Sequence, residues 1–451
     1  MRYAPPGLCL NDFAIIERED DRYELLHLQG PWTNSFDHVH METSYGRAVS
    51  TDLIEWTPLG PGFGVASPGQ FDDTAVWTMH PFRHGDGSVM FYTGVTAKPW
   101  LDQSVGLARS GGRDGTGWVR HGVSPVVTAD PRWYRTEIDM AWRDPFVVRS
   151  DDDSRWVMVL CASDASLPLE QSGCVAWATS TDLENWEVHP PLISPGNVDE
   201  LECPVLERTE HGWVLLGSIG QTRQIECWTA PHLEGPWMRS ATPWPSGAYA
   251  PRVVTAPDGD RVVLHTVPRR VDLTDEGALC RGMLSQPKRL VTGAGDDPLL
   301  VWWDGLDTHL VEESEPAPVT AATAQDVEVR VAIIPISNDT IISVRAKTGD
   351  DEVPAVRLIG RELTWGVEGD ASFSAISLSG RPLSLRILTV GEFIEVYADD
   401  QFVLASSSYR GMPTRITARD ARGEIIATNR VRYRTSTRDD ASAVWRGPIA
   451  R

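Results

Sequence analysis

A nine-residue phrase that occurs twice in this chain limits the folds it can adopt. Ala48–Trp56 (AVSTDLIEW) recurs almost residue for residue as Ala178–Trp186 (ATSTDLENW). Looser copies end at Trp118 and Trp237, so the closing tryptophans follow one another at intervals of roughly sixty residues. A repeat of this length, filled with short strands and turns, is typical of a β-propeller with long blades.

Each repeat contains a run that is typical of a buried strand. The runs are apolar, β-branched or aromatic and are bounded by Gly, Asp and Ser turns. They comprise Val89–Thr93, Trp156–Cys161, Trp213–Leu216 and Arg261–Thr266. The last run follows the fourth copy of the phrase and supplies a further repeat, and no stretch shows sustained helical periodicity. We therefore expect residues 1–300 to form a five-bladed β-propeller.

The texture of the sequence changes after residue 300, where the repeat stops. Glu315–Ala322 is rich in Pro, Ala and Thr and indicates a linker, which we place at residues 301–322. Alternating apolar and polar residues follow, for example at Thr340–Arg345, and such alternation predicts half-buried antiparallel strands. Residues 323–451 are therefore expected to form a β-sandwich, which makes the whole chain all-β.

The charge of the chain limits its partners. With 41 Lys and Arg against 63 Asp and Glu, the formal net charge is −22. So acidic a protein is repelled by nucleic acids and by anionic membranes, and we expect neither as a partner. A neutral, polar small molecule or an oligosaccharide fits this surface better, and self-association into a homo-oligomer stays open.

The expected location follows from the first residues and from the cysteines. Met1–Gly7 carries no long apolar segment of the kind found in secretory signals, and no run approaches the roughly 18 apolar residues of a membrane span. None of the six cysteines has metal-type C-x-x-C spacing. We expect reduced thiols and a cytoplasmic location, with a disulfide between Cys161 and Cys174 as the alternative.

Three carboxylates are the candidate catalytic groups. They are Asp12 in Asn11–Phe13, Asp144 in Arg143–Pro145 and Glu202 in Glu202–Pro204. Each precedes the apolar strand of its repeat by a similar interval, so we expect all three at equivalent positions on innermost strands, where a propeller brings distant residues to one mouth. Two aspartates and a glutamate can supply a nucleophile, a proton donor and a negative charge beside a sugar cation. The alternative for any one of them is a solvated carboxylate in a turn.

These motifs resemble those of glycoside hydrolase family 32, the invertase, inulinase and levanase group. Arg143–Pro145 and Glu202–Pro204 match the R-D-P and E-C-P motifs of the family, and Cys9–Ile15 is similar to its W-M-N-D-P-N-G opening. Further similar segments are Gln29, Gly46–Trp56, Tyr249–Pro251, Gly282–Lys288 and, in the predicted sandwich, Leu385–Asp400. The resemblance implies a five-bladed propeller followed by a β-sandwich. It also implies retaining hydrolysis of fructofuranosyl linkages, as in sucrose, fructo-oligosaccharides or fructans, with no metal and no cofactor.

The resemblance also implies a role for each acid. Asp12 would be the nucleophile, Glu202 the general acid/base, and Asp144 the transition-state stabiliser that holds sugar hydroxyls. Glu202 has to be protonated near neutral pH to act as an acid, so we expect nearby negative charge and partial burial to raise its pKa. Arg143 would keep Asp144 charged and offer a fork of hydrogen-bond donors.

Eight further residues are predicted to bind the substrate. Asn11 can orient the carboxylate next to it, and Cys203 is small enough to pack against the acid. Phe71–Ala75 (FDDTA) stands where the family has F-S-G-S-A, so Asp72 either bonds an additional hydroxyl or blocks part of the sugar pocket. The full set is Asn11, Gln29, Phe71, Asp72, Asp73, Arg143, Cys203 and Tyr249.

Three alternative functions remain open at this point. A fructosyltransferase or a difructose-anhydride-type enzyme would use the same mechanism, because water and a sugar hydroxyl compete for one covalent intermediate. An arabinofuranosidase-like five-bladed glycosidase would act on a furanose ring of similar shape. A carbohydrate-binding propeller without turnover belongs to a different class, although such a protein would need neither an acid nor a nucleophile.

Overall fold

The computed structural model covers most of the chain. It describes residues 3–5, 7–17, 21–30, 42–97, 101–110, 117–137, 140–220, 222, 224–242, 244–245, 247–271, 274, 277, 279–293, 297–312, 329–336, 342–348, 351–366, 374–390, 393–407, 416–419 and 429–433. Within these ranges the chain forms β-strands and short 3-10 helices, so the all-β prediction is confirmed. No helix in the described part of the chain has the length and apolar character needed to cross a bilayer.

The chain divides into two compact units. The first, here called the N-terminal unit, consists of Tyr3–Pro268 and Arg281–Leu300. The second, the C-terminal unit, contains Arg269–Cys280 and the chain from Val301 onward. The predicted bounds of the propeller, linker and sandwich stay a prediction.

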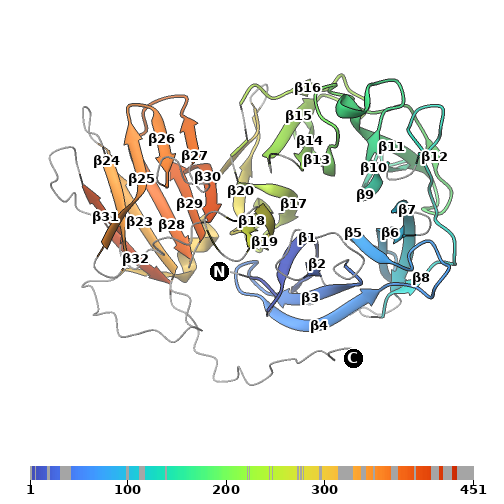
Figure 1. Ribbon diagram of the computed structural model, residues 1–451, viewed down its shortest axis with the longest axis horizontal. Coiled ribbons are helices and arrows are strands. Elements are labelled where there is room, and N and C mark those ends of the chain that lie inside the picture. Colours follow the sequence, from blue (N-terminus) through green and yellow to red (C-terminus); the bar gives the residue numbers. More distant parts are fainter. Residues whose placement is uncertain are drawn as a thin grey trace. The chain divides into compact units, whose positions relative to one another are not determined.

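The N-terminal unit is built from groups of antiparallel strands, here called sheets, that follow one another along the chain (Figure 1). The first two sheets comprise β1 (Cys9–Glu17), β2 (Tyr23–Gly30), β3 (Ser44–Ser50) and β4 (Thr57–Gly64), then β5 (Ala75–His84), β6 (Gly87–Thr96), β7 (Asp102–Ser110) and β8 (Val119–Arg120). The next two comprise β9 (Trp142–Arg149), β10 (Trp156–Ser163), β11 (Gly173–Ser180) and β12 (Glu187–Val188), then β13 (Glu202–Thr209), β14 (Gly212–Ile219), β15 (Gln224–Ala230) and β16 (Met238–Arg239). The 3-10 helix η1 (Leu169–Gln171) precedes β11.

A further group of strands lies mostly in the N-terminal unit. Strand β17 pairs with β18, β18 pairs with β20, and β19 pairs with β1. Their bounds are β17 (Tyr249–Thr255), β18 (Arg261–Arg270), β19 (Leu279–Leu284) and β20 (Lys288–Val291). The four apolar runs singled out in the sequence lie on β6, β10, β14 and β18, each the second strand of its sheet.

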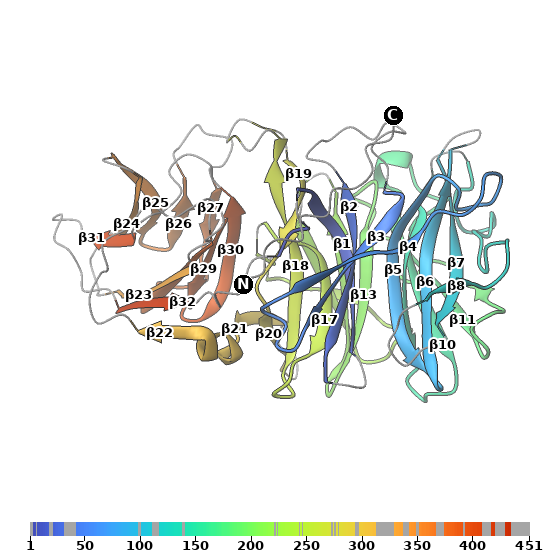
Figure 2. The same ribbon diagram turned by 90° about the horizontal axis from the view of Figure 1, so that it is seen from below.

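The first strands of the sheets contact one another in a closed cycle. Strand β1 contacts β5, β5 contacts β9, β9 contacts β13, β13 contacts β17, and β17 contacts β1. In Figure 1 these strands lie nearest the centre of the N-terminal unit, and Figure 2 shows them along their length. Residues that are far apart in sequence but lie on these strands are thereby brought together.

The repeated sequence phrase builds the same turn twice. In the second copy, Ser180 Oγ accepts the backbone N–H groups of Asp182 and Leu183, and the Asp182 carboxylate accepts those of Glu184 and Asn185. The indole N–H of Trp186 donates to the carbonyl of Leu183, which has a left-handed φ of 69° and a fully buried side chain. The first copy makes the same bonds at Ser50, Asp52, Leu53, Ile54, Glu55 and Trp56. The phrase is thus a structural turn, held against backbone strain by its buried leucine.

The C-terminal unit contains two antiparallel sheets. In spatial order the first has β22 (Leu310–Glu312), β32 (Asn429–Tyr433), β23 (Val329–Pro335), β28 (Ser384–Val390), β29 (Phe393–Ala398) and β30 (Gln401–Ser407). The second has β27 (Ser374–Ser377), β26 (Glu362–Trp365), β25 (Asp351–Ile359), β24 (Ile342–Thr348) and β31 (Ile416–Arg419). One hydrophobic core, which includes Val344, Leu363, Ile387 and Val396, draws side chains from both sheets.

The segment predicted as a linker contains regular structure. Strand β21 (Leu299–Trp302), the 3-10 helix η3 (Asp304–His309) and β22 occupy its first part. Residues 313–322, which include most of the Pro/Ala/Thr-rich stretch, lie outside the described residues, as do residues 323–328 of the predicted sandwich.

The cysteines agree with the prediction of reduced thiols. Cys9, Cys161, Cys174, Cys203 and Cys227 are all buried and free. Although Cys161 and Cys174 lie on the neighbouring strands β10 and β11, the register pairs Cys161 with Val175 and Cys174 with Ala162. Because the two sulfurs are not on residues that face each other, the alternative disulfide does not form.

The turn geometry predicts the effect of shortening its leucines. Leu53→Ala and Leu183→Ala should each lower the free energy of unfolding by about 2–4 kcal/mol, because each removes a buried side chain that holds a left-handed backbone in place. Leu169→Ala, at a 48% exposed leucine, is the control and should change stability by less than about 0.5 kcal/mol. Urea unfolding followed by tryptophan fluorescence measures all three. Wild-type stability in either turn variant would contradict this account of the repeat.

Candidate active site

Three first strands share one backbone irregularity. In β9, β13 and β17 the register shifts at Asp144-Pro145, Cys203-Pro204 and Ala250-Pro251. The residue before each proline has a left-handed φ, of 60°, 50° and 49° respectively. Proline has no N–H to offer the neighbouring strand, and a bulge turns the side chains at its own position away from the regular pleat. The R-D-P, E-C-P and Y-A-P segments are therefore one bulge built three times.

The equivalence of the bulges corrects one prediction from the sequence. Asp12, Asp144 and Glu202 were expected at equivalent positions, but Glu202 corresponds to Arg143, and Cys203 corresponds to Asp144. The prediction rested on the number of residues between each acid and the next strand, and this number is a poor guide because the connecting turns differ in length. Strand β9 ends at Arg149 and β10 starts at Trp156, whereas only two residues separate β13 from β14. Asp12 lies in a separate register shift of β1, between Leu10 and Phe13.

Asp12 is buried and held at one oxygen. Its Oδ2 accepts hydrogen bonds from the Thr78 hydroxyl at 2.6 Å and from the Cys203 thiol at 3.2 Å. Its Oδ1 is buried and has no hydrogen-bond partner among the described residues. Burial, followed by the charges of Asp12 and Asp144, raises the pKa of Cys203 well above its usual value. The thiol therefore stays protonated and can act as a hydrogen-bond donor to Asp12. The carboxylate is therefore oriented through Oδ2, while Oδ1 accepts no hydrogen bond from the described residues.

Asp144 is fixed from two sides. Its backbone N–H donates to Thr93 Oγ1 at 2.9 Å, and its Oδ2 accepts the backbone N–H of Cys203 at 2.9 Å. Burial raises the pKa of Asp144, Arg143 opposes this, and the charge of Asp12 adds to it. Arg143 thus lowers the pKa of Asp144, as predicted, although the desolvation of the carboxyl outweighs the attraction of the guanidinium.

Glu202 lies between a cation and a phenol. Its Oε1 accepts a hydrogen bond from Arg143 Nη2 at 2.8 Å, and its Oε2 accepts a short one from the Tyr249 hydroxyl. Burial raises the pKa of Glu202, and the charges of Glu200 and Asp144 raise it further, against Arg143 and the Tyr249 hydrogen bond. The direction agrees with the prediction for a group that has to deliver a proton near neutral pH.

Sequence reasoning missed three residues at this site. Thr78 lies at the register shift of β5, and nothing in its surroundings in the sequence marks it. Gln103 accepts a hydrogen bond from Arg143 Nη1 at 3.3 Å. Glu200 binds Arg143 through both of its oxygens, and its position two residues before Glu202 is a signal that the sequence did contain.

Two predicted substrate ligands are engaged elsewhere. Asp72 is fully buried, and its Oδ2 accepts hydrogen bonds from Arg120 Nε at 2.6 Å and from the Tyr92 hydroxyl at 2.9 Å. Asp73 holds a turn by accepting the backbone N–H of Gly69 at 2.7 Å and the Thr74 hydroxyl at 3.0 Å. These contacts give Asp72 the role of a buried ion-pair partner, while its Oδ1 has no hydrogen-bond partner in the described part of the chain.

The remaining predicted ligands are Asn11 and Gln29 on strands β1 and β2, and Phe71 in the turn before β5. Asn11 adjoins Asp12 in the β1 register shift, and its carbonyl accepts the Thr266 hydroxyl at 3.0 Å. Gln29 on β2 pairs with Leu10, just before that shift. Phe71 packs against the Tyr92 ring with the centroids 6.2 Å apart. The structure therefore joins Asp12, Arg143, Asp144, Glu202, Cys203 and Tyr249 by direct contacts, and leaves the other five beside this group or apart from it.

Asp12, Asp144 and Cys203 form a cluster of residue types that can bind metal ions. One oxygen each of Asp12 and Asp144 and the Cys203 sulfur lie within 4.8 Å of one another. The hydrogen bonds from Cys203 to both aspartates already account for this proximity. We therefore do not identify these residues as metal ligands.

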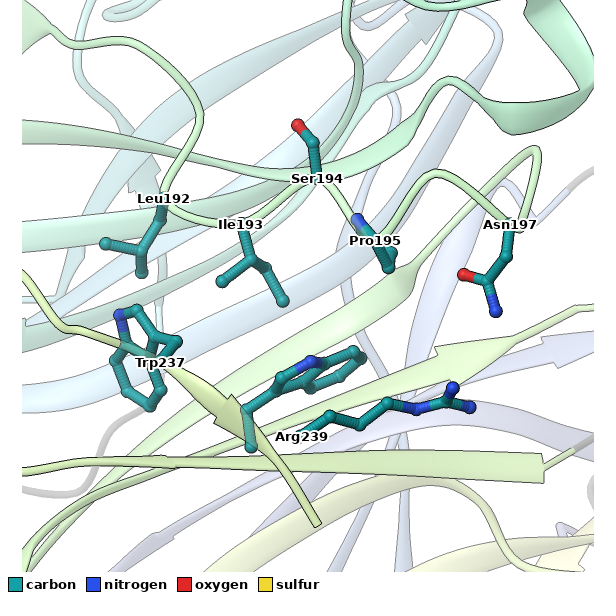
Figure 3. Close-up of a pocket in the computed structure, with 8 residues that line it drawn as sticks. Leu192, Ile193, Ser194, Pro195, Asn197, Trp237 and Arg239 are labelled. Carbon is teal, nitrogen blue, oxygen red and sulfur yellow. The ribbon is translucent and has the colours of Figure 1, made fainter. Parts of the chain in front are cut away.

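The N-terminal unit also contains a pocket of about 590 Å³ (Figure 3). It is lined by Leu192, Ile193, Ser194, Pro195, Asn197, Trp228, Trp237 and Arg239. None of the predicted site residues contributes to it, and its wall at residues 192–197 leads along the chain toward Glu200.

The names of known proteins of similar sequence describe enzymes that cleave fructosides. A levanase of Bacillus sp. (strain L7) is 24% identical over 431 residues, which cover 80% of this chain and 45% of the levanase. A fructan 6-exohydrolase of Beta vulgaris is 23% identical over 223 residues, covering 43% of this chain and 35% of that enzyme. The chain thus spans less than half the length of these curated relatives.

Solved structures and a family model agree with these relatives. A sucrose-6-phosphate hydrolase from Lactobacillus gasseri superposes with a TM-score of 0.75 at 16% identity, covering 96% of this chain and 92% of that one. A Bombyx mori β-fructofuranosidase superposes with a TM-score of 0.72 at 16% identity and the same coverage. At this identity the likeness concerns the fold. The model of the glycosyl hydrolases family 32 N-terminal domain matches residues 3–301, so the resemblance is confirmed and this chain belongs to glycoside hydrolase family 32.

Proposed function

We propose that this protein is a retaining glycosidase that cleaves fructofuranosyl linkages in sucrose, fructo-oligosaccharides or fructans. The observation that carries the proposal is the arrangement of Asp12 and Glu202 around Cys203. The Cys203 thiol donates a hydrogen bond to Asp12, and Cys203 directly follows Glu202 in the chain. The positions of the two acids are therefore linked through Cys203. The names of the family relatives, a levanase and a fructan exohydrolase, support the substrate class.

The contacts of Asp12 suit a nucleophile. Thr78 and Cys203 hold Oδ2, so Oδ1 is the oxygen that forms the bond to the anomeric carbon. As that bond forms, the bond to the glycosidic oxygen breaks, and Glu202 transfers its proton to the leaving oxygen. In the second half, the Glu202 carboxylate takes a proton from water, the water oxygen attacks the anomeric carbon, and Asp12 is released.

Asp144 is the proposed stabiliser of the positive charge that develops on the sugar ring. The backbone N–H of Cys203 occupies its Oδ2 and thereby sets the direction of the carboxyl group. Arg143 orients Glu202, and Tyr249 supports the same carboxyl from the other oxygen. Asn11, Gln29 and Phe71 remain proposed sugar contacts beside these groups.

We further propose that the N-terminal unit is a five-bladed β-propeller and the C-terminal unit a β-sandwich. The closed cycle of contacts among the five first strands and the threefold recurrence of one bulge support the propeller. The shared core of two antiparallel sheets supports the sandwich. A cytoplasmic location is likewise proposed, supported by the free buried thiols.

The acids predict a clear pattern in mutants. Asp12→Asn and Glu202→Gln should each reduce fructose release from sucrose, inulin and levan by at least about 10²–10⁴-fold, because each removes one chemical role. Glu184→Gln, at an exposed carboxylate paired with Arg109, is the matched control and should keep wild-type rates. Chromatography of the products separates hydrolysis from transfer to a second sugar.

Mass spectrometry locates the covalent bond. In slow Glu202→Gln protein mixed with substrate and quenched in acid, a fructosyl unit should be found on the peptide that contains Asp12. A label on another residue, or full activity of Asp12→Asn, would show that the assignment of the nucleophile is wrong.

The charges at the site predict a preference for neutral sugars. Among the described residues, the Arg143 Nη atoms donate to Glu200, Glu202 and Gln103, and Glu200 adds a partly exposed negative charge. We expect kcat/KM for sucrose to exceed that for sucrose 6-phosphate by about tenfold or more at low salt. Raising the ionic strength should narrow the difference. A higher kcat/KM for the phosphorylated sugar would contradict this description of the site.

A further inference from the structure

Glu200 makes the most extensive contact with the arginine of the site. Its Oε1 accepts Arg143 Nη1 at 3.1 Å and its Oε2 accepts Arg143 Nη2 at 2.7 Å, a two-pronged ion pair. The Arg143 side chain is 9% exposed, whereas the Glu200 side chain is 37% exposed and faces solvent on its other side. A two-pronged arginine–carboxylate pair is stronger and more closely defined in direction than a single bond.

The two terminal nitrogens of Arg143 donate hydrogen bonds to three side chains. Nη1 donates to Glu200 and to Gln103, Nη2 donates to Glu200 and to Glu202, and Nε faces Asp144 Oδ2 at 3.7 Å. A guanidinium has five N–H groups in a fixed plane, so its orientation is set by the partner that holds two of them. Glu200 is that partner, and Glu202 receives a single N–H.

The backbone holds Glu200 in this place. The N–H of Gly173 donates to the carbonyl of Val198 at 2.9 Å, and the N–H of Glu200 donates to Asp199 Oδ1 at 2.8 Å. A Cβ atom at Gly173 would lie only 2.7 Å from the backbone nitrogen of Glu200. Glycine is therefore required at position 173 for the segment before β13 to approach this closely.

We propose that Glu200 is a positioning residue for the acid Glu202: it orients Arg143 and takes two of its N–H groups, which leaves Glu202 one hydrogen bond and only part of the cationic charge. This inference rests on the proposed function for the role of Glu202 as the acid. The contacts themselves are independent of that role.

The proposal has a direct electrostatic consequence. Arg143 and Asp144 on β9, Tyr249 on β17 and Glu200 on the preceding segment are the groups that act on Glu202. Glu200 and Asp144 raise the pKa of Glu202, while Arg143 and Tyr249 lower it. Without the Glu200 charge, one raising influence disappears and Arg143 acts on Glu202 more strongly. The pKa of Glu202 then falls, and the protonated form that donates to the leaving group is lost at lower pH.

The test is the pH dependence of kcat/KM on sucrose or inulin. In Glu200→Gln the alkaline limb should move to lower pH by about one unit, because the limb reports the acid of the free enzyme. Glu200→Asp keeps the charge and should return the limb most of the way to its wild-type position. Glu184→Gln removes one exposed charge elsewhere and should leave the limb unchanged. An unmoved limb in Glu200→Gln, with urea unfolding like that of the wild type, would overturn the proposal.

A second readout separates this proposal from the proposed function. The Glu202 carboxyl signal can be followed by ¹³C NMR in glutamate-labelled protein and assigned by its loss in Glu202→Gln. If wild type cleaves no fructoside, the proposed function fails, but the titration still decides the role of Glu200. A lower midpoint of Glu202 in Glu200→Gln supports the proposal, and an equal midpoint rejects it.

Discussion

The bulge at the start of β9, β13 and β17 is the constraint on which the site depends. A residue with left-handed φ followed by proline interrupts the ladder at the same place in each strand. Because the ladder is interrupted, backbone N–H groups donate to side chains instead. The N–H of Cys203 donates to Asp144 Oδ2, and the N–H of Ala250 donates to Ser218 Oγ at 3.0 Å. Left-handed backbone is strained for Asp, Cys and Ala, so the surrounding packing has to hold it. That packing is supplied by the second strands, which are almost wholly buried.

The acids of the site lie in different electrostatic environments. One buried cation, Arg143, serves Glu200 and Glu202 by hydrogen bonds and lies close to Asp144. Desolvation raises the pKa of both Asp144 and Glu202. The charge of Asp12 adds to the rise at Asp144, and the charges of Glu200 and Asp144 add to the rise at Glu202. Asp12 instead receives donors from Thr78 and Cys203. The acids of this site thus differ in their hydrogen-bond partners: Asp12 accepts from a hydroxyl and a thiol, and Glu202 from a guanidinium and a phenol.

Much of the fold could be predicted because it depends on local pattern. The repeated phrase predicted a periodic all-β unit, and the four apolar runs predicted strands that are present in the structure. The family was identified from short motifs that carry the site, including R-D-P and E-C-P. What failed was register: Glu202 was placed level with Asp144 because turn length between paired strands cannot be read by counting. Asp72 could not be assigned from sequence either, because its partner Arg120 lies 48 residues away on β8.

The recurring bulge separates the shape of the site from its chemistry. One backbone conformation presents Asp144, Cys203 and Ala250 in three neighbouring sheets, and Arg143, Glu202 and Tyr249 one residue earlier. The same bulge thus carries an acid, a thiol and a methyl group in three different strands. Because the bulge recurs, side chains occupy several equivalent positions around one centre. New combinations of functional groups can then arise by single substitutions on a scaffold that is already folded.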